Sequence, residues 1–459
     1  MRALLASITA SALALSASLL GEPPSQGEPS HESPPHETPP HETPPHETPW
    51  HQWRGPLSTG ESPDAEPPIE WSETKNVRWK VALPGKGHST PIVTGDRVYV
   101  TAAFPTGEAV EPRHDSAPGS HHAVAVTRRQ AYAVIAVDRT TGAIEWQRTV
   151  HSGLPHEGGH HTGTYASASP VTDGEHVFAF FGSRGLYALS LDGEVEWQLD
   201  LGDMNTKHAH GEGASPALHE DTLIVNWDHE GPSFLVALDK RTGKERWRSP
   251  RDEVSSWATP IVVEHEGRSQ VIVSGTKRIR AYDLESGAVI WECGGLSANI
   301  VASPVAADGM VFAGSSYDSQ ALLAIRLAGS KGDITGSSQV VWQRDRLTPY
   351  VPSPLLYEGK LYYLRHYQGI LSRVEAENGA EPSGPFRLRG VRDVYASPVA
   401  AAGRIYITDR QGVTIVMTTA ATPEILAVNR LDDSFSASAA VVGREIYLRG
   451  ESHLYSLAD

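Results

Sequence analysis

The chain has 459 residues, and its 42 Gly and 33 Pro indicate many turns rather than long helices. Asp and Glu outnumber Lys and Arg by 55 to 39, so the net field at a formal charge of −16 repels nucleic-acid phosphates and anionic lipid headgroups. With 39% hydrophobic residues, the chain is long enough to bury a large core. We therefore expect an all-β fold and no nucleic-acid partner.

The N-terminus has the pattern of an export signal. Met1-Arg2 supplies a positive start, and residues 3–20 form an unbroken stretch of apolar and small residues. We expect a signal peptide over 1–21, a periplasmic or secreted protein, and no transmembrane segment beyond the signal. An uncleaved membrane anchor is the alternative, because the stretch is near the lower length limit for spanning. A lipoprotein is not expected, because this region contains no cysteine.

Residues 22–50 repeat the unit His-Glu-Thr-Pro-Pro. A segment so rich in Pro and so poor in apolar residues is typical of a disordered, semi-extended spacer. Its histidines are spread along the chain without a preformed geometry, so a spacer is favoured over a metal site; they are His31, His36, His41 and His46.

The remaining chain, 51–459, is built of a repeat. Each copy opens with a small residue, a hydroxyl residue and usually Pro, and then continues with strand-like segments. The eight hydroxyl residues are Thr90, Ser169, Ser215, Thr259, Ser303, Ser353, Ser397 and Ser438. A spacing of about 40 to 50 residues is typical of four-stranded propeller blades. We therefore predict an eight-bladed β-propeller of four-stranded antiparallel blades, with an insertion at about 104–130.

The two ends of the repeat array are complementary. The last copy stops after three strands, whereas the sequence around Trp79 has the fourth-strand pattern but precedes the first copy. We expect this N-terminal strand to complete the last blade, which removes exposed sheet edges and makes a monomer sufficient. The fourth-strand Trp residues are expected to pack between blades. Cys293, the single cysteine, excludes an intrachain disulfide and is expected to be an unreactive strand residue.

The stretch SASPVTDGEHVFAFFGSRGLYALSLDGEVEWQLDL, residues 167–201, resembles the repeat of the pyrroloquinoline-quinone (PQQ) propeller superfamily. The enzymatic branch of that superfamily implies PQQ, a calcium ion, a catalytic aspartate and commonly a disulfide of adjacent cysteines. This chain has one cysteine, and we place the calcium and catalytic motifs on none of its residues. A second branch resembles the outer-membrane-protein assembly factor BamB and implies a non-catalytic periplasmic propeller that binds partner proteins. The lipid-anchor cysteine of that branch is missing here.

Polar loops precede several of the repeat openings, where a propeller presents one mouth of its channel. They bring His and Glu side chains that we expect to converge: His156, Glu157, His160, His161, His208, His210 and Glu212. Imidazole and carboxylate together suit a divalent transition metal, and His156, His160, His208 and His210 are the candidate ligands. The alternative is that these loops bond to one another and tie the blades together.

Aromatic residues occupy similar positions before the inner strands. Together with Glu212, they are candidates for a ligand-binding mouth; they are Tyr165, Trp257, Tyr350, Tyr395 and Phe435. Their faces suit a flat quinone, a sugar or a peptide strand, and the alternative is a packing plug.

These observations favour an exported, non-enzymatic scaffold that binds a protein or cell-envelope ligand through its mouth. The alternative is a PQQ-dependent or metal-dependent oxidoreductase, and a carbohydrate-binding module is a third reading. No cofactor is assigned from the sequence, although PQQ or a divalent metal fits the second reading. The insertion at 104–130 is expected to be either a lid or a loose loop.

Overall fold

The structure, a computed structural model, describes residues 47–113, 117 and 119–459. The predicted signal peptide, and the predicted spacer up to residue 46, lie outside these described residues. Glu47–Asp459 form one compact unit. In this part of the chain, no helix has the length and apolar character needed to cross a membrane.

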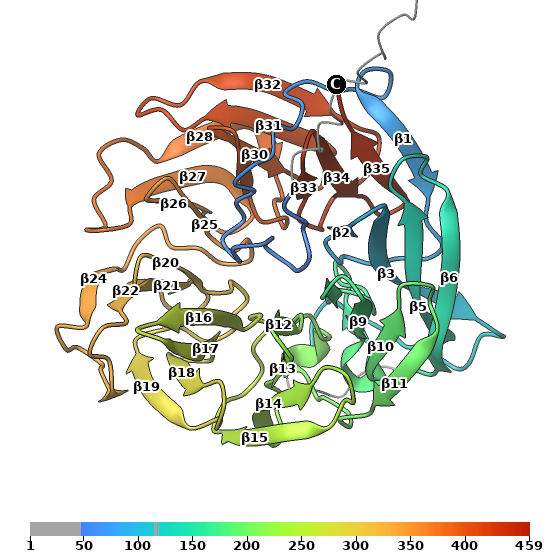
Figure 1. The fold of residues 1–459 in the computed structure, drawn as a ribbon, viewed down its shortest axis with the longest axis horizontal. Coiled ribbons are helices and arrows are strands. Elements are labelled where there is room, and N and C mark those ends of the chain that lie inside the picture. The colour runs from blue at the N-terminus through green and yellow to red at the C-terminus, as the bar shows by residue number, and fades with distance from the viewer. Residues whose placement is uncertain (1–46, 114–116, 118) are drawn as a thin grey trace, which may run out of the picture. The chain divides into compact units, whose positions relative to one another are not determined.

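Within the described residues, eight antiparallel blades surround a central channel, which confirms the predicted propeller (Figure 1). In blades 1 to 7 the strands follow one another from the channel outward. Blade 1 contains β2 (Ile92–Thr94), β3 (Arg97–Thr106), β5 (Arg129–Asp138) and β6 (Ile144–Gly153). Blade 2 contains β8 (Val171–Thr172), β9 (His176–Phe180), β10 (Leu186–Ser190) and β11 (Val195–Leu199). Blade 3 contains β12 (Ala217–His219), β13 (Thr222–Trp227), β14 (Ser233–Asp239) and β15 (Glu245–Arg251).

The next four blades continue around the ring. Blade 4 contains β16 (Ile261–His265), β17 (Arg268–Ser274), β18 (Arg278–Asp283) and β19 (Val289–Gly294). Blade 5 contains β20 (Val305–Ala307), β21 (Met310–Ser315), β22 (Ala321–Arg326) and β24 (Val340–Arg344). Blade 6 contains β25 (Leu355–Tyr357), β26 (Lys360–Leu364), β27 (Gln368–Glu375) and β28 (Phe386–Arg392). Blade 7 contains β29 (Val399–Ala401), β30 (Arg404–Thr408), β31 (Val413–Thr418) and β32 (Ile425–Arg430).

Blade 8 joins the two ends of the repeat array. It contains β33 (Ala440–Val442), β34 (Glu445–Arg449) and β35 (His453–Leu457), and its outer strand is β1 (Val77–Ala82). The antiparallel register of β1 on β35 pairs Lys80 with Tyr455 and Ala82 with His453. The predicted closure by an N-terminal strand is therefore confirmed.

Three smaller features depart from the regular pattern. Blade 4 gains a fifth strand, β23 (Gly332–Asp333), which pairs in parallel with β19 and comes from the long connection between β22 and β24. In the insertion, β4 (Ala123–Val124) pairs with β7 (Gly159–His160), which lies in the loop between blades 1 and 2. Two short 3-10 helices, η1 (Gly182–Arg184) and η2 (Lys207–Ala209), lie in loops.

Outer-strand Trp residues fasten neighbouring blades. Trp197 of β11 donates its indole N–H to the Lys240 carbonyl of blade 3 at 2.9 Å. Its ring lies against Gly243, whose φ is +67° and where a Cβ would stand 2.7 Å from the ring, so only Gly fits this turn. Four other Trp residues donate to the next blade in the same way, namely Trp79, Trp146, Trp247 and Trp342. Trp291 differs, because it donates to Gln270 within its own blade.

The hydroxyl residues that open the repeats form a belt around the channel, which we call the hydroxyl belt. From Ser169 onward, the side-chain oxygen of each belt residue accepts a hydrogen bond from the backbone N–H of the hydroxyl residue one repeat earlier. Seven such bonds, 2.8–3.0 Å long, are made in the described part of the chain, from Thr90 to Ser438. The Thr90 hydroxyl is buried and has no partner among the described residues, so the belt is open where blade 8 meets blade 1.

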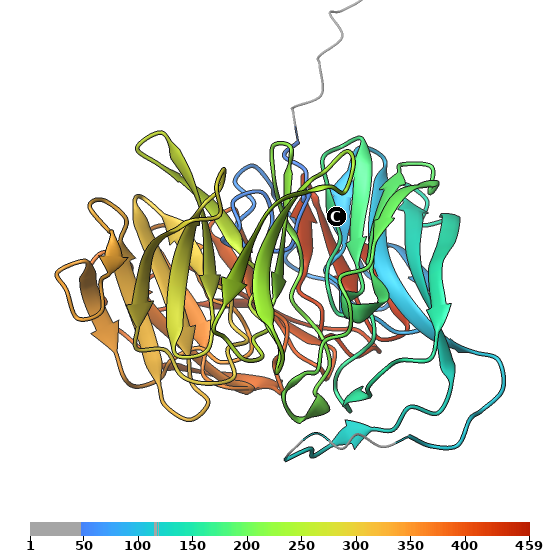
Figure 2. The ribbon, with the colours of Figure 1, turned by 90° about the horizontal axis from the view of Figure 1, so that it is seen from below.

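The segment before β1 crosses the centre of the ring (Figure 1). Its backbone carbonyls accept hydrogen bonds from the inner strands of blades 1, 2, 6 and 7, with Val93 N–H bonding to Trp50 at 2.9 Å and Ala400 N–H to Gly60 at 2.9 Å as examples. Buried Arg54 donates to the carbonyls of Pro398 and Pro354 at 2.7 and 2.8 Å. This segment lies at one end of the channel, and the insertion extends from the opposite face (Figure 2).

We predict that Ser303→Ala lowers the free energy of unfolding by about 1–3 kcal/mol, because the buried N–H of Thr259 loses the acceptor that it now reaches at 2.8 Å. Urea unfolding followed by tryptophan fluorescence measures the change. Ser338→Ala removes an exposed hydroxyl and serves as the control. Equal unfolding free energies for the two variants would contradict a stabilising belt.

Candidate functional site

A polar cavity lies in the channel, next to the hydroxyl belt. Its volume is about 640 Å³, and Trp53 of the N-terminal segment lies in its lining. Six belt residues line it as well: Ser169, Ser215, Thr259, Ser353, Ser397 and Ser438. The loops that enter the inner strands form its rim, as the sequence predicts for a propeller mouth.

Four tyrosines follow one another along the rim, and we call them the tyrosine row: Tyr317, Tyr350, Tyr367 and Tyr395. Successive ring centroids are 6.2, 5.8 and 4.7 Å apart. A cation lies at each end, because the Lys207 ammonium is 5.5 Å from the Tyr317 centroid and the Arg410 guanidinium is 4.9 Å from the Tyr395 centroid. The row thus combines aromatic faces with two positive ends.

Sequence reasoning names Tyr350 and Tyr395 but misses Tyr317 and Tyr367. The two missed residues lie in the turns between the second and third strands of blades 5 and 6. In an antiparallel blade this turn emerges at the same end as the loop that enters the first strand, and that geometry is the signal that identifies them.

The other predicted aromatic residues lie in three different places. Trp257 lines the cavity and donates its indole N–H to the Gly211 carbonyl at 2.7 Å. Tyr165 packs against Tyr132 in a second, neighbouring cavity. Phe435 is fully buried in the core, where its ring packs against Tyr455 of blade 8.

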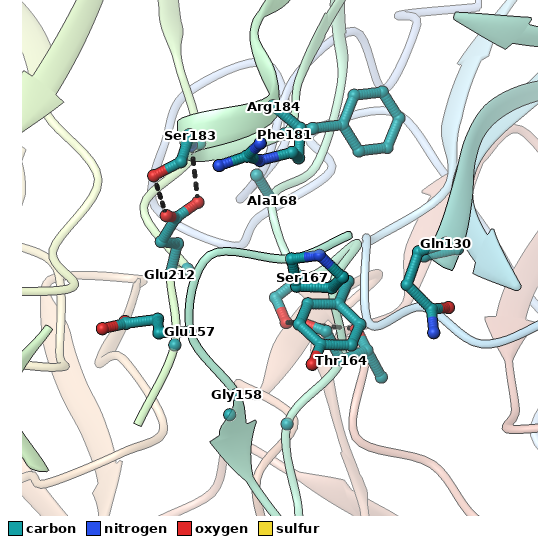
Figure 3. Close-up of a pocket in the computed structure, with 18 of the residues that line it drawn as sticks. Gln130, Glu157, Gly158, Thr164, Ser167, Ala168, Phe181, Ser183, Arg184 and Glu212 are labelled. Atoms are coloured by element: carbon teal, nitrogen blue, oxygen red, sulfur yellow. Dashed lines mark hydrogen bonds between the residues drawn. The ribbon is translucent and has the colours of Figure 1, made fainter. Parts of the chain in front are cut away.

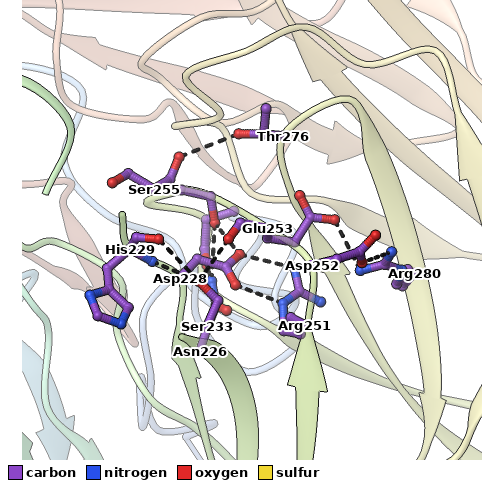
Figure 4. A network of polar contacts seen from close by, with 12 residues as sticks. Asn226, Asp228, His229, Ser233, Arg251, Asp252, Glu253, Ser255, Thr276 and Arg280 are labelled. Carbon is purple, nitrogen blue, oxygen red and sulfur yellow. Dashed lines mark hydrogen bonds and ion pairs between the residues drawn. The ribbon is translucent and has the colours of Figure 1, made fainter. Parts of the chain in front are cut away.

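A buried ion pair supports the loop that carries Trp257 (Figure 4). Arg251 donates to both carboxylate oxygens of Asp228 at 2.7 and 2.9 Å, and both side chains are fully buried. Ser256, the neighbour of Trp257, donates to the same carboxylate at 2.7 Å. Removing one partner would leave a buried charge, so this pair fixes the loop at the rim.

Six histidines gather beside the rim, and we call them the histidine cluster: His121, His122, His160, His161, His208 and His210. Neighbouring ring centroids lie 4.3–5.8 Å apart. The cluster contains three of the four predicted metal ligands. His121 and His122 come from the insertion and are missed by sequence reasoning, because nothing in the repeat pattern shows that β4 pairs with β7.

His156, the fourth predicted ligand, lies apart from the cluster. Its Nδ1 is 3.1 Å from a guanidinium nitrogen of Arg184, and its Nε2 contacts the Met204 carbonyl. Both ring nitrogens of His156 therefore have protein partners.

The second cavity, of about 340 Å³, contains the predicted carboxylates Glu157 and Glu212 (Figure 3). The Glu212 carboxylate accepts hydrogen bonds from the Ser183 backbone N–H at 2.8 Å and from the Ser183 hydroxyl. Glu157 accepts a bond from the Thr206 backbone N–H at 3.1 Å. Glu212 thus ties the loop between blades 2 and 3 to the β9–β10 turn, and Glu157 ties the same loop to the one between blades 1 and 2.

Burial sets the protonation of these groups. Desolvation, followed by the neighbouring imidazoles, lowers the pKa of His160 to about 4 and that of His210 to about 4. Both rings are therefore neutral at physiological pH, which is the form that can act as a ligand or hydrogen-bond acceptor. Desolvation raises the pKa of Glu157 to about 7 and also raises the pKa of Glu212.

A family model described as outer membrane protein assembly factor BamB matches residues 106–251 and 231–458. The chain belongs to this family of PQQ-repeat propellers. No curated protein sequence matches it. Similar solved structures include BamB from Moraxella catarrhalis, with 14% identity, a TM-score of 0.50, and coverage of 78% of this chain and 98% of that chain.

Two solved dehydrogenases share the fold. A europium-containing methanol dehydrogenase has 11% identity and a TM-score of 0.61, and the match covers 90% of this chain and 98% of that chain. A quinohemoprotein alcohol dehydrogenase from Comamonas testosteroni has 10% identity, a TM-score of 0.62, and coverage of 90% and 80%. These identities establish a common fold and carry no assignment of activity.

The cavity lining does not suit the calcium and quinone pair of the enzymatic branch. Calcium takes six to eight oxygen ligands, from carboxylates, amide and backbone carbonyls and water, and sites of high affinity include several carboxylates. Among the described residues that line the central cavity, the carboxylates are Glu212 and Asp393. Glu212 is bonded to Ser183, and Asp393 is 3.3 Å from Arg410, so both are already paired.

We predict that Glu157→Gln changes how stability depends on pH. The folded protein holds the Glu157 proton up to about pH 7, whereas the unfolded chain releases it near its ordinary pKa of 4.5. The stabilisation is therefore complete below the unfolded pKa and is lost as the pH rises to about 7. Since Gln stays neutral, the variant should gain roughly 1 kcal/mol relative to the native protein across this interval.

Urea unfolding at a series of pH values measures this gain. Glu285→Gln, which neutralises an exposed carboxylate, is the control. The raised pKa would be contradicted if the unfolding free energies of Glu157→Gln and the native protein differed by the same amount at both ends of this pH interval.

Proposed function

We propose that this protein is a non-catalytic binding scaffold that takes an extended segment of a partner protein at its channel mouth. The observation that carries the proposal is the tyrosine row with its two cationic ends. Tyr317 is 45% exposed although it lies in a ring-to-ring contact with Tyr350, so a large aromatic face stands open to solvent at the rim. Such faces are enriched where proteins bind one another.

The chemistry of the mouth indicates which segment it would take. Aromatic faces bind aromatic or aliphatic side chains, and Lys207 and Arg410 at the two ends favour carboxylates. Each hydroxyl in the belt that accepts a backbone N–H keeps its own O–H for donation, and six of these hydroxyl groups line the cavity. Peptide carbonyls are suitable acceptors for these donors. We therefore propose a segment with aromatic and acidic side chains.

We also propose that the protein functions outside the cytoplasm, because the sequence of residues 1–21 favours export. N-terminal sequencing of protein from the native envelope fraction tests this part. A mature N-terminus near residue 21 agrees with it, and a chain that begins at Met1 in the cytosolic fraction contradicts it.

Selection of a displayed peptide library on the full chain tests the binding proposal. We predict that enriched peptides carry aromatic and acidic residues and that Tyr317→Ala weakens their binding about tenfold, or ~1.4 kcal/mol. Ile425→Ala is the matched control, because Ile425 lies on β32 and is 44% exposed against 45% for Tyr317.

Peptides that bind both variants equally would contradict binding at the tyrosine row. An array of envelope glycans is screened in parallel. The proposal would be overturned in favour of a carbohydrate-binding module if no peptide were enriched and a glycan bound the native protein more tightly than Tyr317→Ala.

A further inference from the structure

The histidine cluster is assembled from three separate segments of the chain. The insertion brings His121 and His122, the loop between blades 1 and 2 brings His160 and His161, and the loop between blades 2 and 3 brings His208 and His210. Two triads result, one of His122, His160 and His161 and one of His121, His208 and His210, each with ring centroids within 5.8 Å of one another.

The first triad has the spacing of a metal site. Each of His122, His160 and His161 offers a ring nitrogen, and these nitrogens all lie within 4.8 Å of one another. Nitrogen ligands around a tetrahedral zinc ion stand about 3.4 Å apart, given zinc-to-nitrogen distances near 2.1 Å. Side-chain rotations would close the remaining difference, and both His122 and His161 are exposed.

The backbone and a neighbouring hydroxyl hold this triad in place. The backbone N–H of His161 donates to the His122 carbonyl at 2.9 Å, and Ala123 pairs with His160 between β4 and β7. His160 Nδ1 lies 2.7 Å from the Thr162 hydroxyl and accepts a hydrogen bond from the Thr162 backbone N–H at 3.3 Å, and these contacts orient the ring. A hydrogen-bond partner on the second ring nitrogen is typical of metal-binding histidines.

A second observation points to a missing partner beside this triad. The Nε2 atom of His210 is buried and has no hydrogen-bond partner among the described residues. Its ring centroid is 4.9 Å from that of His160. Buried polar atoms in native proteins nearly always have a partner, so this nitrogen indicates a bound ion or water beside the triad.

We propose that His122, His160 and His161 bind a transition-metal ion of the zinc type and thereby fasten the insertion to the loop between blades 1 and 2. Neutral imidazole suits zinc, copper and nickel, and three protein ligands leave a fourth position open. All three histidines line the central cavity, so the ion lies at its rim. This site goes beyond the proposed binding function and does not depend on it.

Zinc titration of the full chain by calorimetry tests the proposal. The native protein should bind one Zn²⁺ that His122→Ala and His161→Ala each weaken at least about 100-fold. The control is His219→Ala, which removes a half-buried histidine on β12, outside the cluster. The histidines of residues 31–46 are present in every variant, so the difference between variants reports on the cluster.

Hydrogen exchange supplies a second readout. Zn²⁺ should slow exchange at residues 119–126 in the native protein and in His219→Ala, but not in His122→Ala. Full zinc affinity in His122→Ala, or an equal loss in His219→Ala, would overturn the site. Unchanged exchange in the zinc-loaded native protein would overturn the fastening of the insertion.

Discussion

The hydroxyl belt is the interaction on which the position of the mouth depends. Each of its bonds joins the start of one inner strand to the start of the next, at 2.8–3.0 Å, and the loops that enter those strands form the rim. Trp257 precedes its belt residue, Thr259, by two positions, and Tyr395 precedes Ser397 in the same way. A shift at one belt position would therefore move an aromatic residue of the rim. The hydrogen bonds of the outer-strand Trp residues lie farther from the channel axis and join each of these blades to the next one.

Much of the fold could be predicted from the sequence because a propeller repeats one local pattern. The hydroxyl residue recurs in all eight blades and the outer-strand Trp in six of them, and the orphan strand at Trp79 supplies the strand that the last blade lacks. The departures arise where the pattern is interrupted. The strand β23 pairs with β19 of the preceding blade, and Trp291 bonds to Gln270 in its own blade. Neither pairing has a periodic signal.

The candidate site was less predictable, because contacts between loops depend on geometry that no repeat encodes. Tyr350 and Tyr395 follow from their positions before inner strands, whereas Tyr317 and Tyr367 need the antiparallel path of each blade. The histidine cluster depends on β4 of the insertion reaching β7 in the loop between blades 1 and 2, a pairing of only four residues. His156 lies next to the other histidines in sequence, yet Arg184 holds it elsewhere.

The most direct test of the central claim is photo-crosslinking in cells that make the protein natively. A photoreactive amino acid is placed at Tyr317, in the tyrosine row, or at the equally exposed Ile425 on the outer strand of blade 7. Our account predicts one defined protein adduct from position 317 that is absent from position 425 and that maps to an acidic, aromatic segment of the partner. Identical adducts from both positions, or adducts from position 425 alone, would contradict a binding site at the channel mouth.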